Sequence, residues 1–330
     1  MVRCFVTGGA GFIGSHLVDR LLAEGNQVTA FDNLSSGQER WLQHHDGETN
    51  FAFVRGDLRD AETLNQTIQG HDVVWHLGAN ADIPGGKLQV DKDLTNNTIG
   101  THNLLEAMRS AEIRELLFSS TSAVYGDPPV SPTPETAGPL LPISLYGAAK
   151  LACEGLISSY CHLFGIQAWI FRFANVVGSR MSRGVIHDFV HRLIRNTKEL
   201  QVLGDGQGEK PFFLVEECIE GMLHAWKNTQ GQCDVFNLGC TTTTRIDRVA
   251  EVVIEEMGLT KLSINYAGGR RGFPGDVPEL YLDVSKMRAL GWATQRTSDE
   301  AVRAAARRLI QEATSRETSV GPRTRLASAD

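Results

Sequence analysis

A glycine-rich turn near the start of the chain restricts the possible folds more than any other feature. The string TGGAGFIGSHL occupies residues 7–17, between a β-rich run at residues 2–7 and a segment of helical period at residues 13–24. The string contains three glycines spaced three residues apart: Gly8, Gly11 and Gly14. Such glycines allow a tight turn, a close approach of backbone to a pyrophosphate, and close packing of helix on strand, and the helix N-terminus binds phosphate. The segment therefore predicts a dinucleotide-binding βαβ unit.

Strand-like and helical segments alternate through the first half of the chain. The expected strands span residues 2–7, 27–32, 51–54, 73–77, 115–120 and 168–173, and the longest expected helices span 13–24, 91–110 and 146–164. Apolar β-rich runs that alternate with longer segments of helical period are typical of βαβ units. The pattern predicts an α/β fold with a doubly wound parallel sheet of the Rossmann type, whose ligands bind at the carboxyl ends of the strands.

The pattern also divides the chain into three regions. Residues 1–175, where the alternation is regular, are expected to form the dinucleotide-binding Rossmann domain. In residues 176–313, loops rich in Gly and Pro separate shorter elements, which indicates a smaller α/β domain that binds mainly the substrate. Residues 314–330 are polar and lack an apolar stripe, so they are expected to form a flexible tail.

Composition narrows the class of partner. The net charge of -7 and the pI near 5.8 argue against binding to nucleic acid or to an anionic membrane, because both need concentrated positive charge. No run approaches the roughly 18 apolar residues of a membrane span. Six cysteines without a CxxC pair, and a chain that opens directly into a strand-like segment, indicate the cytoplasm. The expected partner is a small molecule.

An acidic residue at the end of the second expected strand selects the cofactor. Asp32 follows the glycine turn by about twenty residues, where a carboxylate accepts hydrogen bonds from the ribose hydroxyls of the adenosine half. The same carboxylate repels a 2'-phosphate, and no Arg or Lys lies in the glycine turn or directly after Asp32. The sequence therefore predicts NAD rather than NADP. Asp57, after the third strand, is placed to meet the adenine edge, although either Asp is also a common turn residue.

Tyr146 and Lys150 stand four residues apart in the motif SLYGAAK. On a helix this spacing places both side chains on one face. A free phenol titrates near ~10, so a tyrosine base acting near neutrality needs a shift of about three units, or about 4 kcal/mol. An adjacent ammonium and the positive nicotinamide of NAD+ both act in that direction. Upstream, a buried strand ends in four hydroxyl residues that can bond a reacting oxygen: Ser119, Ser120, Thr121 and Ser122.

Further motifs make a family resemblance specific. The strings TGGAGFIG, FDNLSSG, HLGAN, NNTIGTHNLLEA, SSTSAVYGD, YGAAK and FRFANVVGSR occur in this order. In these motifs the chain resembles the extended short-chain dehydrogenase/reductase superfamily. Through RFANVVG, GVIHDF, LGDG and RGFPGDVP it resembles, more narrowly, the NAD-dependent epimerase/dehydratase family and its UDP-glucose 4-epimerases. The likeness covers approximately residues 1–312.

The resemblance implies a reaction and its catalytic residues. It makes Thr121, Tyr146 and Lys150 catalytic in a nucleotide-sugar 4-epimerase of the UDP-glucose/UDP-galactose type. Tyr146 removes the C4 hydroxyl proton while hydride passes from C4 to NAD+, and hydride then returns to the other face of the 4-keto sugar. The coenzyme is regenerated and stays bound. The resemblance also implies a homodimer built on the helices at residues 91–110 and 146–163.

The predicted binding residues come from both domains. The predicted cofactor contacts are Gly8, Gly11, Phe12, Ile13, Gly14, Asp32, Asn33, Asp57, Leu58, Leu77, Ala79, Asn97, Tyr146 and Lys150. The predicted UDP-sugar contacts are Thr121, Ser122, Asn175, Val185, Arg192, Lys210, Arg271 and Asp276. Asn97 matches the asparagine on the nicotinamide side in the family, and Asn175 matches the one that holds the diphosphate. Arg271 is favoured over Lys210 as a diphosphate ligand because Arg binds phosphate in a bidentate manner.

Some departures from the family pattern leave alternatives open. The 4,6-dehydratases of the superfamily carry an Asp-Glu pair directly after the catalytic Thr, and its UDP-glucuronate decarboxylases carry a Glu two residues after it. This chain has Ser122 and Ala123 there. UDP-glucuronate is an alternative substrate because Thr121 and Ser122 suit a C6 carboxylate. Pro84 stands where related chains often have Arg, and Pro211 replaces a polar residue, so both leave the details of the sugar pocket open. A net dehydrogenase or reductase, and a noncatalytic dinucleotide-sensing regulator, are the other functions left open.

His187 and His191 are the residues that most resemble a metal-binding pair. They lie four residues apart in an expected helix, in the string HDFVH. The string lacks the Glu of HExxH, and no third ligand accompanies it in the sequence. We therefore expect no metal site.

Overall fold

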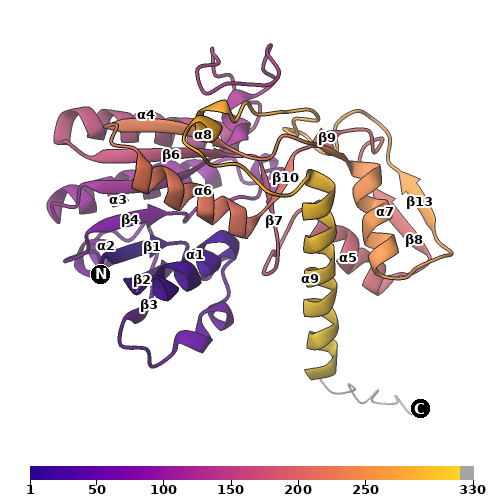
Figure 1. The fold of residues 1–330 in the computed structure, drawn as a ribbon, viewed down its shortest axis with the longest axis horizontal. Helices are drawn as coiled ribbons and strands as arrows, with labels where there is room; N and C mark the ends of the chain where they lie inside the picture. The colour runs from indigo at the N-terminus through magenta and orange to yellow at the C-terminus, as the bar shows by residue number, and fades with distance from the viewer. Residues whose placement is uncertain (320–330) are drawn as a thin grey trace.

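A seven-stranded parallel sheet forms the centre of the computed structural model, which describes residues 1–319 (Figure 1). Its strands lie in the order β11-β6-β5-β4-β1-β2-β3. Their bounds are β1 Arg3–Thr7, β2 Gln27–Asp32, β3 Phe51–Arg55, β4 Val73–His76, β5 Glu115–Thr121, β6 Gln167–Phe173 and β11 Cys233–Leu238. Except for β11, this is the strand order of a dinucleotide-binding Rossmann sheet. The predicted doubly wound α/β fold is confirmed.

Helices cover both faces of this sheet. The helices on one face are α1 (Phe12–Ala23) and α6 (Val215–Asn228), and those on the other are α2 (Ala61–Thr67), α3 (Gly100–Ser110) and α4 (Leu145–Phe164). Side chains of β1 alternate between the two layers: Cys4 and Val6 pack in the core under α1, whereas Phe5 packs in the core under α3. Because strands buried on both faces need apolar residues at every position, the strands read as continuous apolar runs.

The chain returns to the first domain after it has left it, which corrects the predicted division at residue 175. Helix α6 packs beside α1, and β11 pairs in parallel with β6 over its whole length, from Cys233 opposite Ala168 to Leu238 opposite Phe173. Residues 215–238 therefore belong to the Rossmann layer. Elements of the second domain interrupt the alternation of strands and helices between β6 and β11. The sequence pattern therefore did not predict this return.

The second domain contains short strand pairs and three helices within the described residues. The pairs are β7 (Asn175–Val177) with β10 (Phe212–Leu214), β8 (Glu199–Val202) with β13 (Ser263–Tyr266), and β9 (Glu209–Lys210) with β12 (Thr244–Arg245). The helices are α5 (Val185–Arg195), α7 (Ile246–Glu256) and α9 (Ser298–Ser319), whereas the short helix α8 (Ser285–Ala289) packs against β11 of the Rossmann layer. Helices α5, α7 and α9 enclose a separate apolar core that includes Phe189, Val253 and Val302.

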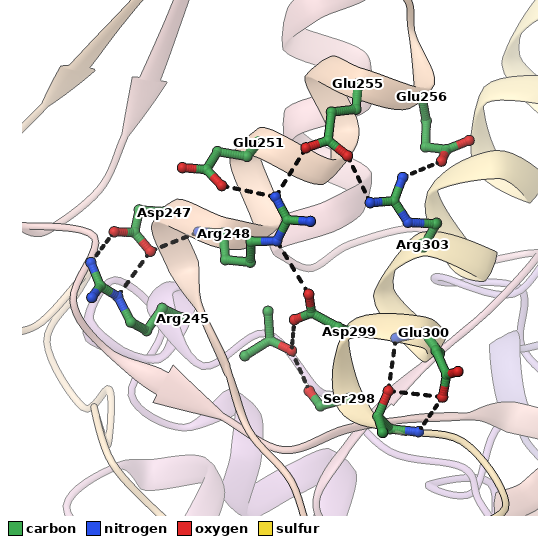
Figure 2. Close-up of polar contacts among 12 residues, drawn as sticks. Arg245, Asp247, Arg248, Glu251, Glu255, Glu256, Ser298, Asp299, Glu300 and Arg303 are labelled. Carbon is green, nitrogen blue, oxygen red and sulfur yellow. Dashed lines mark hydrogen bonds and ion pairs between the residues drawn. The ribbon is translucent and has the colours of Figure 1, made fainter.

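Ion pairs join α7 to α9 on the outside of that core (Figure 2). Arg248 contacts Glu255 at 3.0 Å and Asp299 at 3.2 Å, and Arg303 contacts Glu255 at 2.7 Å and Glu256 at 2.6 Å. A single exposed pair contributes roughly 0–1 kcal/mol. The shared carboxylate of Glu255 makes these pairs a network that fixes the two helices relative to each other.

Helix α9 is longer than the sequence pattern predicted. It continues to Ser319, so residues 314–319 are helical instead of forming the start of a tail. A polar segment can extend a helix that is already nucleated, because propagation costs much less than nucleation. The rest of the predicted tail, residues 320–330, lies outside the described residues.

Candidate active site

A cavity of about 750 Å³ opens along the carboxyl ends of the central strands. The glycine turn forms one part of its wall, the ends of β2, β3 and β4 form another, and the first turns of α4 close it. Of the predicted cofactor contacts, its lining contains Gly8, Gly11, Phe12, Ile13, Gly14, Asp32, Asn33, Asp57, Leu58, Leu77, Ala79, Tyr146 and Lys150. These residues, spread over 143 positions of the sequence, are thus brought to one wall.

The glycine turn leaves no room for side chains. Gly8 has a φ of +66°, a backbone conformation that favours glycine. A Cβ on Gly8 would lie 2.7 Å from the backbone nitrogen of Gly78, and one on Gly14 would lie 2.0 Å from the carbonyl oxygen of Gly8. Helix α1 therefore packs directly on the turn, and it begins after Gly11, which has no side chain to cap it. The first N–H groups of α1 are left open to an anion in the cavity.

Asp32 lies at the end of β2, as the sequence predicted. Its carboxylate is buried and accepts hydrogen bonds from the backbone N–H groups of Ala10 at 3.0 Å and Leu34 at 2.8 Å. Burial raises the pKa of Asp32, and these two hydrogen bonds oppose the increase. A carboxylate has about four acceptor positions, so Asp32 keeps capacity for ribose hydroxyls.

Asp57 is held by two neighbours beside Asp32. Asn33 donates to it at 2.9 Å, and the guanidinium of Arg59 contacts it at 2.7 Å. Hydrogen bonding to Arg59 holds the pKa of Asp57 well below its usual range. Arg59 also lines the cavity, but Asp57 neutralises its charge. This arrangement offers little attraction to a 2'-phosphate.

Asn97 does not line the cavity, in contrast to the other predicted cofactor contacts. Its side chain is 2% exposed, accepts a hydrogen bond from the Asn80 N–H at 2.7 Å and donates to the Asn80 carbonyl at 3.0 Å. A second donation, at 3.2 Å, goes to Asp93. Because Asn80 does line the cavity, Asn97 acts on the site by fixing the loop after β4.

The predicted catalytic pair lies in the first two turns of α4. The Ser144 hydroxyl caps this helix by accepting a hydrogen bond from the Gly147 N–H at 3.0 Å, which sets the position of Tyr146. Lys150 is 2% exposed, donates to the Ser119 carbonyl at 2.6 Å and lies 4.6 Å from the centre of the Phe118 ring. Its ammonium therefore has one direct acceptor, at the end of β5.

Burial moves the two pKa values of the pair in opposite directions. It raises the pKa of Tyr146 to about 12, and a hydrogen bond with Thr121 and the charge of Arg183 act against this increase. Burial lowers the pKa of Lys150 to about 8, opposed by the nearby Cys153, Glu154 and Asp93. Both shifts disfavour the charged form, as low-dielectric surroundings do. The Tyr146 phenol is thus neutral near pH 7, and a positive charge in the cavity in addition to that of Lys150 is needed to ionise it.

The hydroxyl residues at the end of β5 divide into two pairs. Ser119 and Ser120 line the cavity, whereas Thr121 and Ser122 do not. Thr121 instead lies at the Tyr146 hydroxyl and accepts a hydrogen bond from the Ala123 N–H at 3.2 Å. Thr121 is therefore placed to orient the phenol.

The predicted substrate contacts lie apart from this wall. The residues concerned are Thr121, Ser122, Asn175, Val185, Arg192, Lys210, Arg271 and Asp276, and none lines the 750 Å³ cavity. Three of them meet one another: Lys210 contacts Asp276 at 2.7 Å, and Arg271 donates to the Asp276 carbonyl. Arg271 also contacts Asp127 at 2.7 Å.

Two other predicted substrate contacts bond to backbone. Arg192 donates to the Gln201 carbonyl of β8 at 2.6 Å, and Asn175 donates to the Pro211 carbonyl at 3.4 Å. The Arg192 side chain is thus directed at a strand of its own domain. Its predicted role as a sugar contact has no support in this geometry.

The structure adds residues to the site that the sequence analysis did not single out. Ser182 and Arg183, from the loop between β7 and α5, line the cavity. Their signal was their place directly after the FRFANVVGSR motif. His76 is buried below the site between the hydroxyls of Thr7 at 2.7 Å and Thr101 at 2.9 Å. Burial lowers the pKa of His76 to about 3, so it is neutral.

Two histidine pairs lie outside the cavity wall. The rings of His187 and His191 lie 4.2 Å apart, and His187 contacts Asp188 at 3.3 Å. Among the described residues, one group places three possible ligand atoms within 4.8 Å of one another: Asp19, His44 and His45. Asp19 also contacts Arg180 at 2.8 Å, and the group is not part of the cavity wall.

The residues of the cavity fit a dinucleotide. The glycine turn allows a backbone approach that any Cβ would block, the start of α1 offers N–H groups to a pyrophosphate, and Asp32 offers a carboxylate to a ribose.

Comparison with known proteins agrees with this fit. The profile of the NAD dependent epimerase/dehydratase family matches residues 4–239. The chain belongs to this family.

Individual relatives cover nearly the whole chain. A putative UDP-glucose 4-epimerase of Methanocaldococcus jannaschii is 34% identical over 87% of this chain and 92% of its own length. A crystal structure of UDP-galactose 4-epimerase is 37% identical, with a TM-score of 0.84 over 94% of this chain and 99% of the other. The UDP-glucuronic acid 4-epimerase of Bacillus cereus, solved with UDP-glucuronic acid and NAD, is 27% identical, with a TM-score of 0.85 over the same shares. The family and its neighbours thus establish NAD as the cofactor of this fold.

Within residues 1–319, no helix is both long enough and apolar enough to cross a bilayer.

Proposed function

We propose that the protein is an NAD-dependent UDP-sugar 4-epimerase. The observation that carries the proposal is that Tyr146 and Lys150 line the cavity that contains the glycine turn and Asp32, with Thr121 beside Tyr146 at the end of β5. A proton acceptor beside a hydride acceptor is what reversible oxidation of an alcohol requires. Relatives named as UDP-glucose, UDP-galactose and UDP-glucuronic acid 4-epimerases support the choice of C4 and of a UDP-sugar.

The chain supplies the proton chemistry and the positioning. Bound NAD+ would supply the hydride acceptor for oxidation at C4 and the hydride donor for the return reaction. Tyr146 takes the proton of the C4 hydroxyl and gives it back, and its negative charge in that interval is stabilised by the buried ammonium of Lys150. Thr121 orients the phenol. Asp32 and the start of α1 hold the adenosine and phosphate groups.

The residues after Thr121 favour epimerisation over elimination or decarboxylation. Both of those reactions need an additional acid or base at the sugar, and Ser122 and Ala123 offer none. The 3-10 turn that begins at Ser122 is capped by Thr121. Return of the hydride is then the simplest fate of an oxidised C4.

UDP-glucose or UDP-galactose is the first substrate choice, and UDP-glucuronate is the second. Arg183 favours the second. It lines the cavity, acts on Tyr146 by its charge, and forms no ion pair with a described residue. A free guanidinium near the reacting end suits a carboxylate on C6, because Arg and carboxylate pair in a bidentate manner.

Incubation of the NAD-loaded protein with a panel of UDP-sugars tests both reaction and substrate. We expect chromatography to resolve a C4 epimer, without reduced cofactor accumulating in solution. Stoichiometric release of NADH would instead identify a net dehydrogenase. Absence of conversion with every UDP-sugar would favour a dinucleotide-sensing regulator.

We also propose that the protein is a homodimer in the cytoplasm. The segments 94–110 and 145–164 carry exposed apolar side chains, which are Leu94, Ile99, Leu145, Leu163 and Phe164. Exposed apolar side chains on two helices that pack together favour a four-helix interface between two copies. A monomeric mass at micromolar protein concentration would contradict the dimer.

A further inference from the structure

A buried ion pair lies behind the catalytic strand end. Glu154 of α4 and Arg172 of β6 have side chains that are 7% and 5% exposed, and they form two contacts, at 2.7 and 3.1 Å. Arg172 also donates to the Tyr125 hydroxyl at 3.0 Å, which in turn donates to Asn237 at 2.8 Å. Burying two charges is costly, and apolar residues of similar volume often stabilise a core as well. Stability alone therefore does not account for this pair.

Successive turns of α4 hold consecutive residues at the end of β5. Tyr146 contacts Thr121, the Lys150 ammonium donates to the Ser119 carbonyl, and the Ser120 hydroxyl donates to the Glu154 carboxylate. Residues four apart share one helix face, so the three α4 side chains all face the last three residues of β5. Glu154 is the one of the three that has no part in proton transfer.

The contact at Glu154 differs from the other two because its charge does not change during the reaction. Tyr146 and Lys150 must keep their contacts while the charge on the phenol changes. The Glu154–Arg172 ion pair, which Arg172 anchors to β6, keeps its charges throughout and can hold the backbone of Ser120 in one place. Ser120 lies between the two residues that contact the catalytic pair, so its position determines theirs.

We propose that Glu154, fixed by Arg172, is a positioning residue that sets the end of β5 against α4 and so aligns Lys150 and Tyr146 for proton transfer. The proposal rests on the proposed function for its kinetic test. The charge of Glu154 acts in the same sense, since it is one of the effects that oppose the lowering of the Lys150 pKa by burial.

Two double variants separate positioning from support of the fold. Glu154→Leu/Arg172→Met removes the pair and the acceptor of Ser120 without leaving a lone buried charge. Glu154→Gln/Arg172→Met also removes both charges but keeps an oxygen for Ser120. With the UDP-sugar that the wild type epimerises, we expect the Leu/Met variant to lose about 10²-fold in kcat, the usual effect of a misplaced catalytic group. We expect KM and bound NAD to stay near wild type, and kcat of the Gln/Met variant to recover to within about tenfold.

A pair remote from the cavity serves as control. Glu256→Gln/Arg303→Met removes an ion pair of the α7–α9 network (Figure 2), and kcat should not change. If the Leu/Met variant does not fold, Ser120→Ala removes the same hydrogen bond and leaves the ion pair intact. A folded, NAD-loaded Leu/Met variant with wild-type kcat would overturn the proposal.

A second measurement decides the proposal without a substrate. Ultraviolet titration of Tyr146, taken as the difference from Tyr146→Phe, reports the phenol directly. With NAD bound, whose positive nicotinamide lowers the pKa of the phenol, we expect this pKa to be higher in the Leu/Met variant than in the wild type, because the hydrogen bond with Thr121 is disturbed. An unchanged titration refutes positioning. Absence of turnover in the wild type with every UDP-sugar, by contrast, refutes the proposed function and leaves this measurement to decide the role of Glu154.

Discussion

Replacing Lys150 by methionine should make the cofactor-free protein more stable near pH 7 while removing its activity. Burial lowers the pKa of Lys150 from 10.5 to about 8, and this difference corresponds to about 3 kcal/mol of unfolding free energy. The variant avoids that cost but loses the charge-assisted hydrogen bond to the Ser119 carbonyl, worth about 2 kcal/mol. We expect a net gain of about 1 kcal/mol at pH 7.

The pH dependence of stability shows in which direction the buried charge of Lys150 acts. Below about pH 8 Lys150 is protonated in both states, so the folded state bears the full cost of the buried charge. Between about pH 8 and 10.5 the unfolded state binds more protons, and the stability of the wild type therefore rises with pH. The variant lacks this contribution. The advantage of the variant should shrink by about 3 kcal/mol as the pH rises through this window.

Urea unfolding of both proteins at pH 7 and near pH 10, after removal of bound cofactor, measures this difference. Lys227→Met is the matched control, because Lys227 is exposed and contacts Glu24 on the surface. Its effect should be small and nearly independent of pH. A stability difference between wild type and Lys150→Met that stays constant over the window would refute the assignment of a buried, charged Lys150.

Further predictions concern catalysis and ligand choice. Tyr146→Phe should lower turnover by about 10²- to 10⁴-fold with NAD still bound; wild-type epimerisation by this variant would show that another group takes the C4 proton. Thr121→Ser should be mild and Thr121→Val severe in steady-state kinetics, since the hydroxyl orients the phenol and the methyl does not. Calorimetric titration should show tighter binding of NAD than of NADP, and Asp32→Asn should narrow the gap because it removes the charge that repels a 2'-phosphate; a wild type that prefers NADP would contradict this. Arg183→Gln should raise KM for UDP-glucuronate about tenfold or more and change KM for UDP-glucose little; equal effects on both sugars would remove the argument for a carboxylate.

The cofactor half of the fold was predictable because its constraints are local. The tight turn at Gly8, the close packing at Gly14 and the strand-end carboxylate of Asp32 each follow from a few neighbouring residues. The path from β6 to β11 was not predictable in this way. It depends on the pairing of Cys233–Leu238 with β6 across four intervening strands of the other domain, and strand pairing at that sequence distance leaves no local pattern.

For the catalytic and substrate residues too, the sequence predicted the type of residue but not the group that it contacts. The spacing of Tyr146 and Lys150 predicted that they share a helix face. Which carbonyl accepts the hydrogen bond of the Lys150 ammonium depends on the register of α4 against β5. Lys210 and Arg271 were recognisable as cations, yet each already contacts a carboxylate, Asp276 or Asp127 respectively. A diphosphate at these residues has to compete with those carboxylates. Its binding energy is therefore the difference between two ion pairs, which no count of positive residues in the sequence can supply.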